Sequence, residues 1–391
     1  MSWVSLPLDQ LADPKPRAFT GGPFGSKLTS KDYVAEGVPV IRGANLTGGR
    51  HLREDNFVFV SEQKLREDLF GNVAHRGDIV FTQRGTLGQV SIIPSNSLFE
   101  EYVISQSQMK LTVDPSKADS RFVYYWFSAR ETIEKIISQN SSSGVPHINL
   151  TVLRNFKISV PTLREQQHIA DILSAYDDLI ENNRRRIALL EEAARLLYRE
   201  WFVHFRFPGH EHVKITDGLP EGWKRLPFGA ALTLQRGFDL PVAKRLSGDI
   251  PVYGSSGIVG MHNLPKVSIP TVITGRSGSL GEVRYVDDPC WPLNTSLWVK
   301  EFKLVSAHFA YFLMKNMDLK QFNGGASVPT LDRKVVHAAS INLPSKLLIS
   351  LFDEQVIMLF AQKKILENQI RKLNDARDIL LPRLMNGEIA V

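Results

Sequence analysis

Two stretches of the chain carry apolar residues at alternating steps of four and three, which is the pattern of a long helix that buries one stripe of its surface. The first runs over residues 164–202, after a Thr-x-x-Glu capping box at Thr162 and Glu165. The second runs over 352–385 and contains Pro382, so we expect its last turn to kink or fray. Neither stretch is apolar all round, so each helix needs one partner, and the other helix is the obvious one.

The two stripes share one register, which predicts that the helices pair antiparallel as a coiled coil. The first stripe consists of Ile169, Leu173, Tyr176, Ile180, Asn183, Ile187, Leu190, Ala194, Leu197 and Trp201. The second consists of Phe352, Val356, Leu359, Lys363, Leu366, Ile370, Leu373, Arg377, Leu380 and Leu384.

The rest of the chain contains short β-rich runs separated by glycine and proline, in two segments at about 1–155 and 220–345. We expect strands at 56–60, 78–81 and 89–93 in the first segment, and at 271–274 and 281–286 in the second. Each segment also holds one helical pattern, over 120–138 and over 307–317. A linker rich in proline and glycine, 207–222, ends the first long helix and opens the second segment.

The second half of the chain repeats the first. Residues 140–202 align with 323–385 without a gap, and Gly85-Thr86-Leu87-Gly88 aligns with Gly278-Ser279-Leu280-Gly281 further upstream. The alignment offset shrinks along the chain, so the first copy is the longer one, with its extra residues between Trp3 and Asn140. A tandem repeat with a rigid helical register and a variable β-rich part suggests two different recognition units on one frame, related by an approximate dyad.

Composition narrows the class of protein only a little. A length of 391 residues suggests two or three domains, and 43% hydrophobic residues is ordinary for a globular protein. The single cysteine, Cys290, excludes an internal disulfide framework and fits a reducing cytoplasm. We see no signal peptide and no apolar run near the ~18 residues of a membrane span. The net charge of +6 is compatible with a nucleic-acid partner but is weak support for one.

Several motifs together resemble the specificity subunit of type I restriction–modification enzymes, over essentially the whole chain. They are GGPFGSKL at 21–28, GVPVIRG at 37–43, GDIVFTQRGTLGQV at 77–90, VPHINLTVLRNFKISVPTLREQQHIADIL at 145–173, LLEEAARLLYREWF at 189–202, IPVYGSSGIVG at 250–260, TGRSGSLGEV at 274–283 and LLPRLMNGEI at 380–389. One departure is the start of the second long helix, which reads Ser345-Lys346-Leu347-Leu348 and lacks the Thr-x-x-Glu cap.

The resemblance implies an α+β fold with two tandem α/β target recognition domains, separated by two long helices that pair as an antiparallel coiled coil with pseudo-two-fold symmetry. Expected boundaries are 1–158 for the first recognition domain, 159–215 for the central helical spacer, 216–344 for the second recognition domain and 345–391 for the C-terminal spacer. Each domain would read one half of a split, asymmetric site on double-stranded DNA. The spacers would dock two modification (methyltransferase) subunits, to which two restriction (motor-nuclease) subunits add. The chain itself would bind no cofactor and catalyse no reaction, with S-adenosylmethionine, ATP and Mg²⁺ held by the partners.

The loops at 82–88 and 274–281 are the first candidate DNA contacts, because each follows a strand, contains permissive glycines and carries an arginine that can bind a guanine edge or a phosphate. The alternative is a structural hairpin with a solvated arginine. The small polar segments at 140–144 and 323–327 precede Val-Pro and then His147 or Thr330, which could reach DNA or merely belong to a capped loop. The full set of candidate DNA-binding residues is Lys27, Arg42, Asn45, Arg84, Thr86, Ser142, His147, Asn149, Arg236, Tyr253, Arg276, Ser277, Ser279, Thr330 and Arg333.

Apolar residues beside or beyond the paired stripes are candidates for the subunit interface, since a two-helix coiled coil buries only one stripe per helix. They are Leu189, Leu196, Phe202, Ile379 and Leu381. Some of them could instead pack against the recognition domains.

Other motifs give weaker hypotheses. The loop 21–27 lacks the GKS or GKT ending of a nucleotide-binding P-loop, and His210-Glu211-His212 lacks the geometry of a metal site, so we expect neither ATP nor metal binding there. Arg184-Arg185-Arg186 is either a solvated helix face or a surface for DNA or an acidic partner. Two other functions stay open: a self-sufficient DNA methyltransferase or nuclease, which S-adenosylmethionine binding by the isolated chain would reveal, and a coiled-coil DNA-binding regulator, which would carry one reader per chain.

Overall fold

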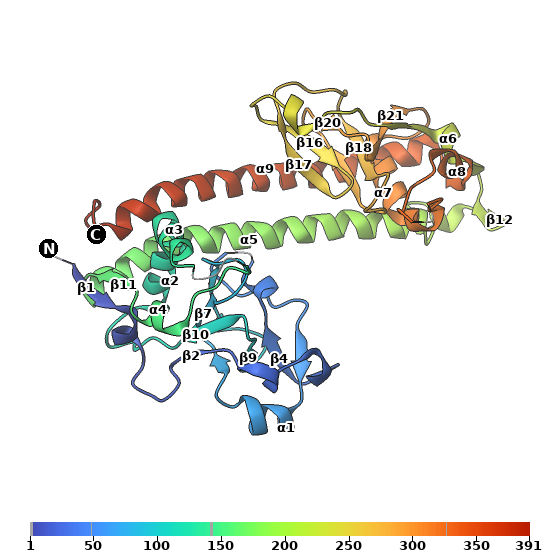
Figure 1. Cartoon of the computed structure of the whole chain (residues 1–391). Helices are drawn as coiled ribbons and strands as arrows, with labels where there is room; N and C mark the ends of the chain where they lie inside the picture. Colours follow the sequence, from blue (N-terminus) through green and yellow to red (C-terminus); the bar gives the residue numbers. More distant parts are fainter. Residues whose placement is uncertain (1–2, 48, 141–143, 326) are drawn as a thin grey trace. The chain divides into compact units, whose positions relative to one another are not determined.

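The computed structural model describes residues 3–47, 49–140, 144–325 and 327–391. The chain divides into two compact units. The first unit contains the chain up to Arg184 together with Asn368–Val391, and the second contains Arg185–Glu367. Two 40-residue helices, α5 (Leu163–Phe202) and α9 (Lys346–Met385), are each divided between the two units (Figure 1).

The first unit is built on two sheets. A four-stranded antiparallel sheet has the order β2-β10-β7-β8, and a five-stranded sheet has the order β3-β5-β4-β9-β6 with one parallel pair, β4 and β9. The first strand, β1, pairs antiparallel with β11, the strand that leads into α5 (Figure 1). The strands are β1 (Val4–Pro7), β2 (Phe19–Gly21), β3 (Tyr33–Val34), β4 (Val38–Ile41), β5 (Val58–Val60), β6 (Val73–His75), β7 (Ile79–Thr82), β8 (Val90–Ile92), β9 (Glu101–Ile104), β10 (Gln108–Leu111) and β11 (Lys157–Val160). The shorter helices are α1 (Glu62–Lys64), which continues as one π-helical turn, α2 (Ser120–Ser128), α3 (Arg130–Ser138) and α4 (Leu150–Arg154).

The second unit follows the same plan. Its four-stranded sheet has the order β15-β21-β18-β19, a smaller sheet has the order β17-β16-β20 with the parallel pair β16 and β20, and β14 pairs with β22, the strand that leads into α9. The strands are β12 (Ile215–Thr216), β13 (Leu219–Pro220), β14 (Lys224–Pro227), β15 (Leu232–Arg236), β16 (Ile250–Gly254), β17 (Gly257–His262), β18 (Thr271–Gly275), β19 (Val283–Val286), β20 (Trp291–Pro292), β21 (Ser296–Phe302) and β22 (Ser340–Leu343). The helices are α6 (Phe228–Ala231), α7 (Ala307–Asn316) and α8 (Arg333–Ala338).

The shared strand orders confirm the internal repeat that the sequence predicts. The extra length of the first copy builds β3 and β6, which widen its second sheet, and the helical segment that starts at α1. Leu65 and Leu69 of that segment pack on Val38 and Val60 in a small core of their own. The insertion therefore adds to the second sheet and leaves the repeated framework intact.

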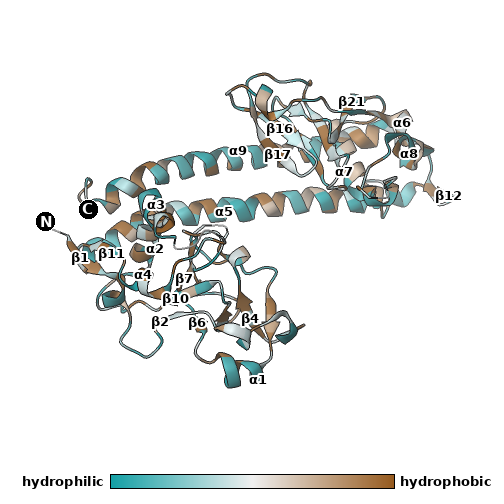
Figure 2. Cartoon of the chain, viewed as in Figure 1, coloured by the Kyte–Doolittle hydropathy of each residue, from teal (hydrophilic) through white to brown (hydrophobic). Residues whose placement is uncertain are grey.

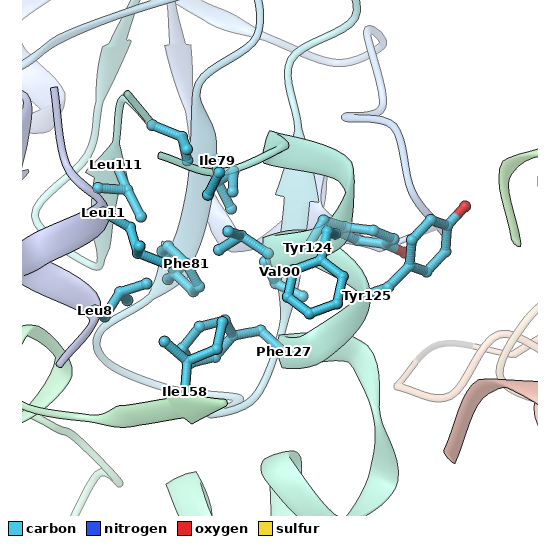
Figure 3. Packing of buried hydrophobic residues seen from close by; sticks show 14 of the residues in the cluster. Leu8, Leu11, Ile79, Phe81, Val90, Leu111, Tyr124, Tyr125, Phe127 and Ile158 are labelled. Carbon is cyan, nitrogen blue, oxygen red and sulfur yellow. The ribbon is translucent and has the colours of Figure 1, made fainter. Parts of the chain in front are cut away.

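The main core of the first unit lies between the four-stranded sheet, α2 and α5. Phe81 of β7 and Phe127 of α2 meet edge to face with ring centroids 5.1 Å apart, and Leu8, Leu111 and Ile158 surround them (Figure 3). Because successive strand residues face opposite sides of a sheet, Ile79 and Phe81 both point into this core.

The predicted helix at 120–138 is in fact two helices, α2 and α3. Ala129 between them has extended backbone angles, with φ −68° and ψ 136°, so the chain changes direction there. Phe122 and Phe127 of α2 are fully buried, and Ile136 of α3 is buried too. Both segments keep the apolar periodicity, which is why the break could not be seen in the sequence.

Both long helices begin with a side-chain cap. Thr162 and Glu165 form the predicted capping box, with the Glu165 carboxylate 3.0 Å from the Thr162 N–H and the Thr162 hydroxyl accepting from the Glu165 N–H at 3.4 Å. The hydroxyl of Ser345 accepts from the Leu348 N–H at 3.3 Å, so α9 begins at Lys346, earlier than the apolar stripe indicates. Of the expected kink or fraying at Pro382, the fraying is contradicted, since α9 continues as a helix to Met385.

Residues of both apolar stripes are buried or half-buried, which confirms the predicted seam. Within the first unit, Asp177 pairs with Arg377 and Asn183 with Gln369, so the two helices run antiparallel there. Within the second unit, Glu191 binds Lys363 at 2.6 Å in the same sense. Hydrophobic and hydrophilic residues are interspersed along both helices (Figure 2), as expected for helices that bury one face.

The first unit attaches α2 to the helix pair through a polar cluster. The Asp177 carboxylate of α5 accepts from the Tyr125 hydroxyl of α2 at 2.6 Å and from Arg377 of α9 at 2.6 Å. Only 8% of Asp177 is exposed, and burial together with this carboxylate raises the pKa of Tyr125. Arg50, from the loop after β4, reaches both the Tyr125 hydroxyl and Asp178 of α5.

The second unit uses apolar residues at the three equivalent positions. Phe312 of α7 stands where Tyr125 stands in α2, and Phe360 and Ala194 take the places of Asp177 and Arg377. The Phe312 and Phe360 rings lie 6.1 Å apart, and Ala194 is fully buried. The joint, meaning the contact of α2 or α7 with the two long helices, is therefore ionic in the first unit and aromatic in the second.

We expect Arg377→Ala to destabilise the first unit by about 3 kcal/mol, because it leaves a buried carboxylate without its cation. This is the low end of the range for a buried pair, since 22% of the Arg377 side chain is exposed. The matched control is the triple variant Tyr125→Phe, Asp177→Phe, Arg377→Ala, which installs the residues of the second unit and should recover most of the loss. Urea unfolding of the purified chain measures both. Equal stability of Arg377→Ala and the unaltered chain would show that the cluster does not hold this joint.

Candidate nucleic-acid interface

Two loops that are far apart in the sequence lie side by side at one end of the four-stranded sheet of the first unit. The turn between β7 and β8 meets the segment that leads into α4. The Gly85 N–H donates to the Pro146 carbonyl at 2.9 Å, and the Ile148 N–H donates to the Gln83 carbonyl at 3.0 Å. The structure thus brings together the two loops that the sequence singled out separately.

The second unit repeats this junction bond for bond. The Gly278 N–H donates to the Pro329 carbonyl at 2.9 Å, and the Leu331 N–H donates to the Arg276 carbonyl at 2.8 Å. The glycines at the turn, Gly85 and Gly278, have φ values of 107° and 87°, a left-handed backbone that side chains other than glycine rarely adopt.

An asparagine side chain closes each junction. The amide oxygen of Asn140 accepts from the His147 N–H at 3.0 Å, and that of Asn323 accepts from the Thr330 N–H at 2.8 Å and from the Gly325 N–H at 3.0 Å. The sequence indicated only a permissive polar loop here. Recurrence of asparagine at both aligned positions was the signal for this structural role.

A close backbone approach brings a third segment to the same end. A Cβ on Gly22, just after β2, would lie 2.0 Å from the Ser105 carbonyl oxygen, and one on Gly237, just after β15, would lie 2.1 Å from that of Leu293. Only glycine fits at either position. The ends of β2 and β15 are therefore held against the loops that precede β10 and β21.

The hydrogen-bond pattern also shows which residues of the two loops are equivalent. The Gln83 and Arg84 N–H groups both donate to the Ser107 carbonyl, and those of Arg276 and Ser277 both donate to the Thr295 carbonyl. Gln83 is therefore equivalent to Arg276, and Arg84 to Ser277. Backbone bridges that join Arg84 to His147 and Ser277 to Thr330 give the same alignment. Arg84 and Arg276 therefore occupy neighbouring positions of the two loops, as the alignment of Gly85 with Gly278 indicates.

In the second unit, two arginines share one acceptor. Arg276 donates from Nη1 to the Asn294 carbonyl at 3.2 Å, and Arg236 donates from Nε to the same oxygen at 3.3 Å. The amide of Asn294 in turn donates to the Asp239 carboxylate. Arg276 is half-buried and Arg236 is exposed, so the two guanidinium groups are held close together at the surface.

In the first unit, glutamines and a glycine occupy these positions. Gly21 is equivalent to Arg236, and the Gln83 amide oxygen lies 3.3 Å from the place of a Cβ on Gly21. Gln106, equivalent to Asn294, donates from its amide to the carbonyls of Gly25 and Leu28, at 3.1 Å to the latter. This fixes the loop that carries Lys27.

The other candidate DNA-binding residues divide into exposed and structural ones. Those with exposed side chains at the loops are Lys27, Arg84, Thr86, Ser279 and Arg333, whereas His147, Ser277 and Thr330 are half-buried. Tyr253, at the end of β16, is half-buried, and burial raises its pKa. Asn149 is exposed, but its side chain caps α4 by accepting from the Val152 N–H at 2.8 Å. Ser142 lies outside the described residues.

Asn45 is not available as a DNA contact, which corrects the sequence-based assignment. Only 2% of it is exposed. Its oxygen accepts from the Arg42 N–H, and its amide donates to the carbonyls of Arg53 and Asp55. Arg42 is half-buried and donates to the Asn56 carbonyl at 2.8 Å, so both residues stabilise the turn after β4.

The candidate arginines at these junctions form no direct ion pair among the described residues. Ion pairs within the described residues involve other arginines, such as Arg50 and Arg121. Those pairs do not include Arg84 and Arg276 of the two loops, Arg236 at the end of β15 or Arg333 at the start of α8. Guanidinium groups without carboxylate partners are suited to bind phosphates and guanine edges.

Elsewhere in the described ranges, no group of three or more His, Cys, Asp or Glu side chains is placed to hold a metal ion, and His210-Glu211-His212 forms an exposed turn. The helices in the same ranges include none that is long and apolar enough to cross a membrane.

Three of the five residues predicted for the subunit interface have exposed side chains on α5 or α9. Leu189 is 69% exposed, Leu196 45% and Ile379 63%. The expectation of an exposed side chain is wrong for Phe202 and Leu381, which are each 7% exposed. Phe202 packs against Phe309 and Phe352 in the core of the second unit, and Leu381 lies in the core of the first, because the last turn of each helix is part of a core.

Comparison with known proteins gives a consistent result. A family model described as the type I restriction modification DNA specificity domain matches residues 25–192. The type I restriction enzyme MjaIX specificity subunit of Methanocaldococcus jannaschii is 25% identical, over 92% of this chain and 89% of that protein. The HindI specificity subunit of Haemophilus influenzae is 22% identical, over 80% and 87%.

A solved structure supports the fold. The type I restriction–modification S subunit from M. genitalium superposes with a TM-score of 0.60 at 19% identity, over 98% of this chain and 96% of that one. The two relatives are specificity subunits of type I restriction enzymes, and this chain is similar to them over most of its length.

Proposed function

We propose that the chain selects the DNA site for a type I restriction–modification complex by reading two different half-sites, and that it leaves the chemistry to its partners. The observation that carries this proposal is the pair of equivalent loop junctions, one in each unit, with the same backbone hydrogen bonds and different side chains. A repeated scaffold with exchanged side chains is the arrangement expected of two readers with unlike specificities.

The chemistry of the loops supports contact with duplex DNA. Arginine forks bind guanine in the major groove and also bind phosphates, whereas glutamine and asparagine amides match adenine. The first unit presents Gln83, Arg84 and His147, and the second presents Arg276, Ser277 and Thr330 at the same backbone positions. Because these three positions carry different residues in the two units, the two half-sites should differ and the site should be asymmetric.

The helices suit a spacer role. Each has 40 residues, which corresponds to about 60 Å of helix. We propose that this length sets a gap of unread base pairs between the two half-sites. The domain boundaries at residues 158, 215 and 344 stay predictions, with the qualification that the end of α9 packs into the core of the first unit.

We further propose that the exposed apolar faces of α5 and α9 dock two modification subunits, and that two restriction subunits join them in the cytoplasm. S-adenosylmethionine, ATP and Mg²⁺ would then act on the partner subunits. Leu189, Leu196 and Ile379 support such a surface, since apolar side chains of this size are seldom left in water without a partner.

The proposal predicts a split, non-palindromic methylation motif. Genome-wide mapping of modified bases, in cells with and without this chain, should reveal two unlike half-sites separated by bases of any identity. The motif should disappear when this chain alone is deleted. A palindromic or continuous motif, or a motif that persists without the chain, would contradict the proposed function.

Docking on the helices predicts that Leu189→Asp together with Ile379→Asp weakens binding of the modification subunit, by roughly tenfold or more if both side chains are buried at the interface. Co-purification and titration with that subunit measure the effect. The control is Leu264→Asp, an exposed leucine (58%) outside α5 and α9, which should leave binding unchanged. If the helix variant bound as tightly as the control, the interface would lie elsewhere.

A further inference from the structure

The ends of the central strands β7 and β18 place Gln83 and Arg276 at one equivalent backbone position. Resting on the proposed function, we propose that this position reads one base pair in each half-site, with Gln83 selecting adenine and Arg276 selecting guanine. Gln83 was not among the candidates from the sequence, because the arginine of its loop, Arg84, was chosen instead.

The two side chains lie toward the same neighbour. Gln83 lies against Gly21 at the end of β2, and Arg276 shares the Asn294 carbonyl with Arg236 at the end of β15. Gly21 and Arg236 are themselves equivalent, because Gly22 and Gly237 make the same close approach to the loop before β10 or β21. Both side chains therefore leave the strand end on the same side of the scaffold.

The chemistry at this position differs in a way that matches two bases. An arginine fork donates two hydrogen bonds to the O6 and N7 atoms of guanine, whereas a glutamine amide accepts from N6 and donates to N7 of adenine. Arg276 uses one N–H on the Asn294 carbonyl, which fixes the plane of the guanidinium and leaves its other N–H groups for a ligand. A side chain held in place before binding loses less entropy on binding.

The adjacent position has a different environment and provides a control. Arg84 and Ser277 follow Gln83 and Arg276, and their backbone bridges the segment that contains His147 or Thr330. The Gln83 side chain lies against Gly21, whereas the backbone of Arg84 bridges to His147, so the two residues have different neighbours. Variants at Arg84 should weaken binding without exchanging the base that Gln83 selects.

The test uses Gln83→Arg and Arg276→Gln in the complete complex with its modification subunits. Binding of duplexes that differ at one base pair is measured at fixed salt, and methylation motifs are mapped in cells. We expect Gln83→Arg to change one A·T pair of one half-site to G·C, with a roughly 10- to 100-fold reversal of preference. Arg276→Gln should make the opposite change in the other half-site only. Arg84→Ala should leave both base identities as they were.

If Gln83→Arg or Arg276→Gln does not assemble with the modification subunits, Gln83→Ala or Arg276→Ala takes its place. Each alanine variant should relax base selection at the same single base pair. Retention of both base preferences by all four variants would overturn the inference while leaving a split motif, and thus the proposed function, intact. The inference would also be overturned if the motif of the unaltered chain lacked an A·T pair in one half-site or a G·C pair in the other. A palindromic or continuous motif would instead overturn the proposed function itself.

Discussion

Each unit completes its hydrophobic core with a helix end that comes from a distant part of the chain. Leu381, Leu384 and Met385 of α9 lie in the core of the first unit with residues such as Leu8 and Phe122. The last turns of α5, with Tyr198 and Phe202, do the same in the second unit. Neither β-rich segment can bury its apolar face without the antiparallel helix pair, and the position of the loop junctions depends on this constraint.

The same constraint allows the joint between helices and sheets to vary in chemistry. The first unit uses the cluster of Tyr125, Asp177 and Arg377, and the second uses aromatic and small residues at the equivalent positions. A buried ionic cluster is sensitive to the loss of any one member, whereas an aromatic contact tolerates exchange of apolar side chains more easily. The joint can therefore change while the loops at the far end of each sheet keep their shared hydrogen bonds.

Most of the fold could be predicted from the spacing of residue types along the chain. The helical register, the Thr162 capping box and the internal repeat follow from local residue types, and the structure confirms all three. The break at Ala129 and the early start of α9 could not be predicted, because apolar periodicity does not report a change in backbone direction or a single serine cap.

The candidate site was predicted less completely. The sequence indicated both loops of each junction, but contact between them depends on backbone hydrogen bonds that join segments about 60 residues apart in the first unit. Asn45, predicted to contact DNA, and Phe202 and Leu381, predicted to lie at the subunit interface, are buried. Alignment on Gly85 and Gly278 places Arg84 opposite Ser277 and Gln83 opposite Arg276, and the backbone hydrogen bonds agree with this equivalence.

The central claim is that the two loop junctions are where the chain meets DNA. Hydrogen exchange of the assembled complex, with and without a duplex carrying its methylation motif, tests this directly. Protection should appear on DNA binding in peptides covering 83–88 and 145–149 and in those covering 276–281 and 328–332, while the loop 12–18 between β1 and β2 stays unchanged. Protection confined to one unit, or present in loop 12–18 and absent from the junctions, would contradict the claim.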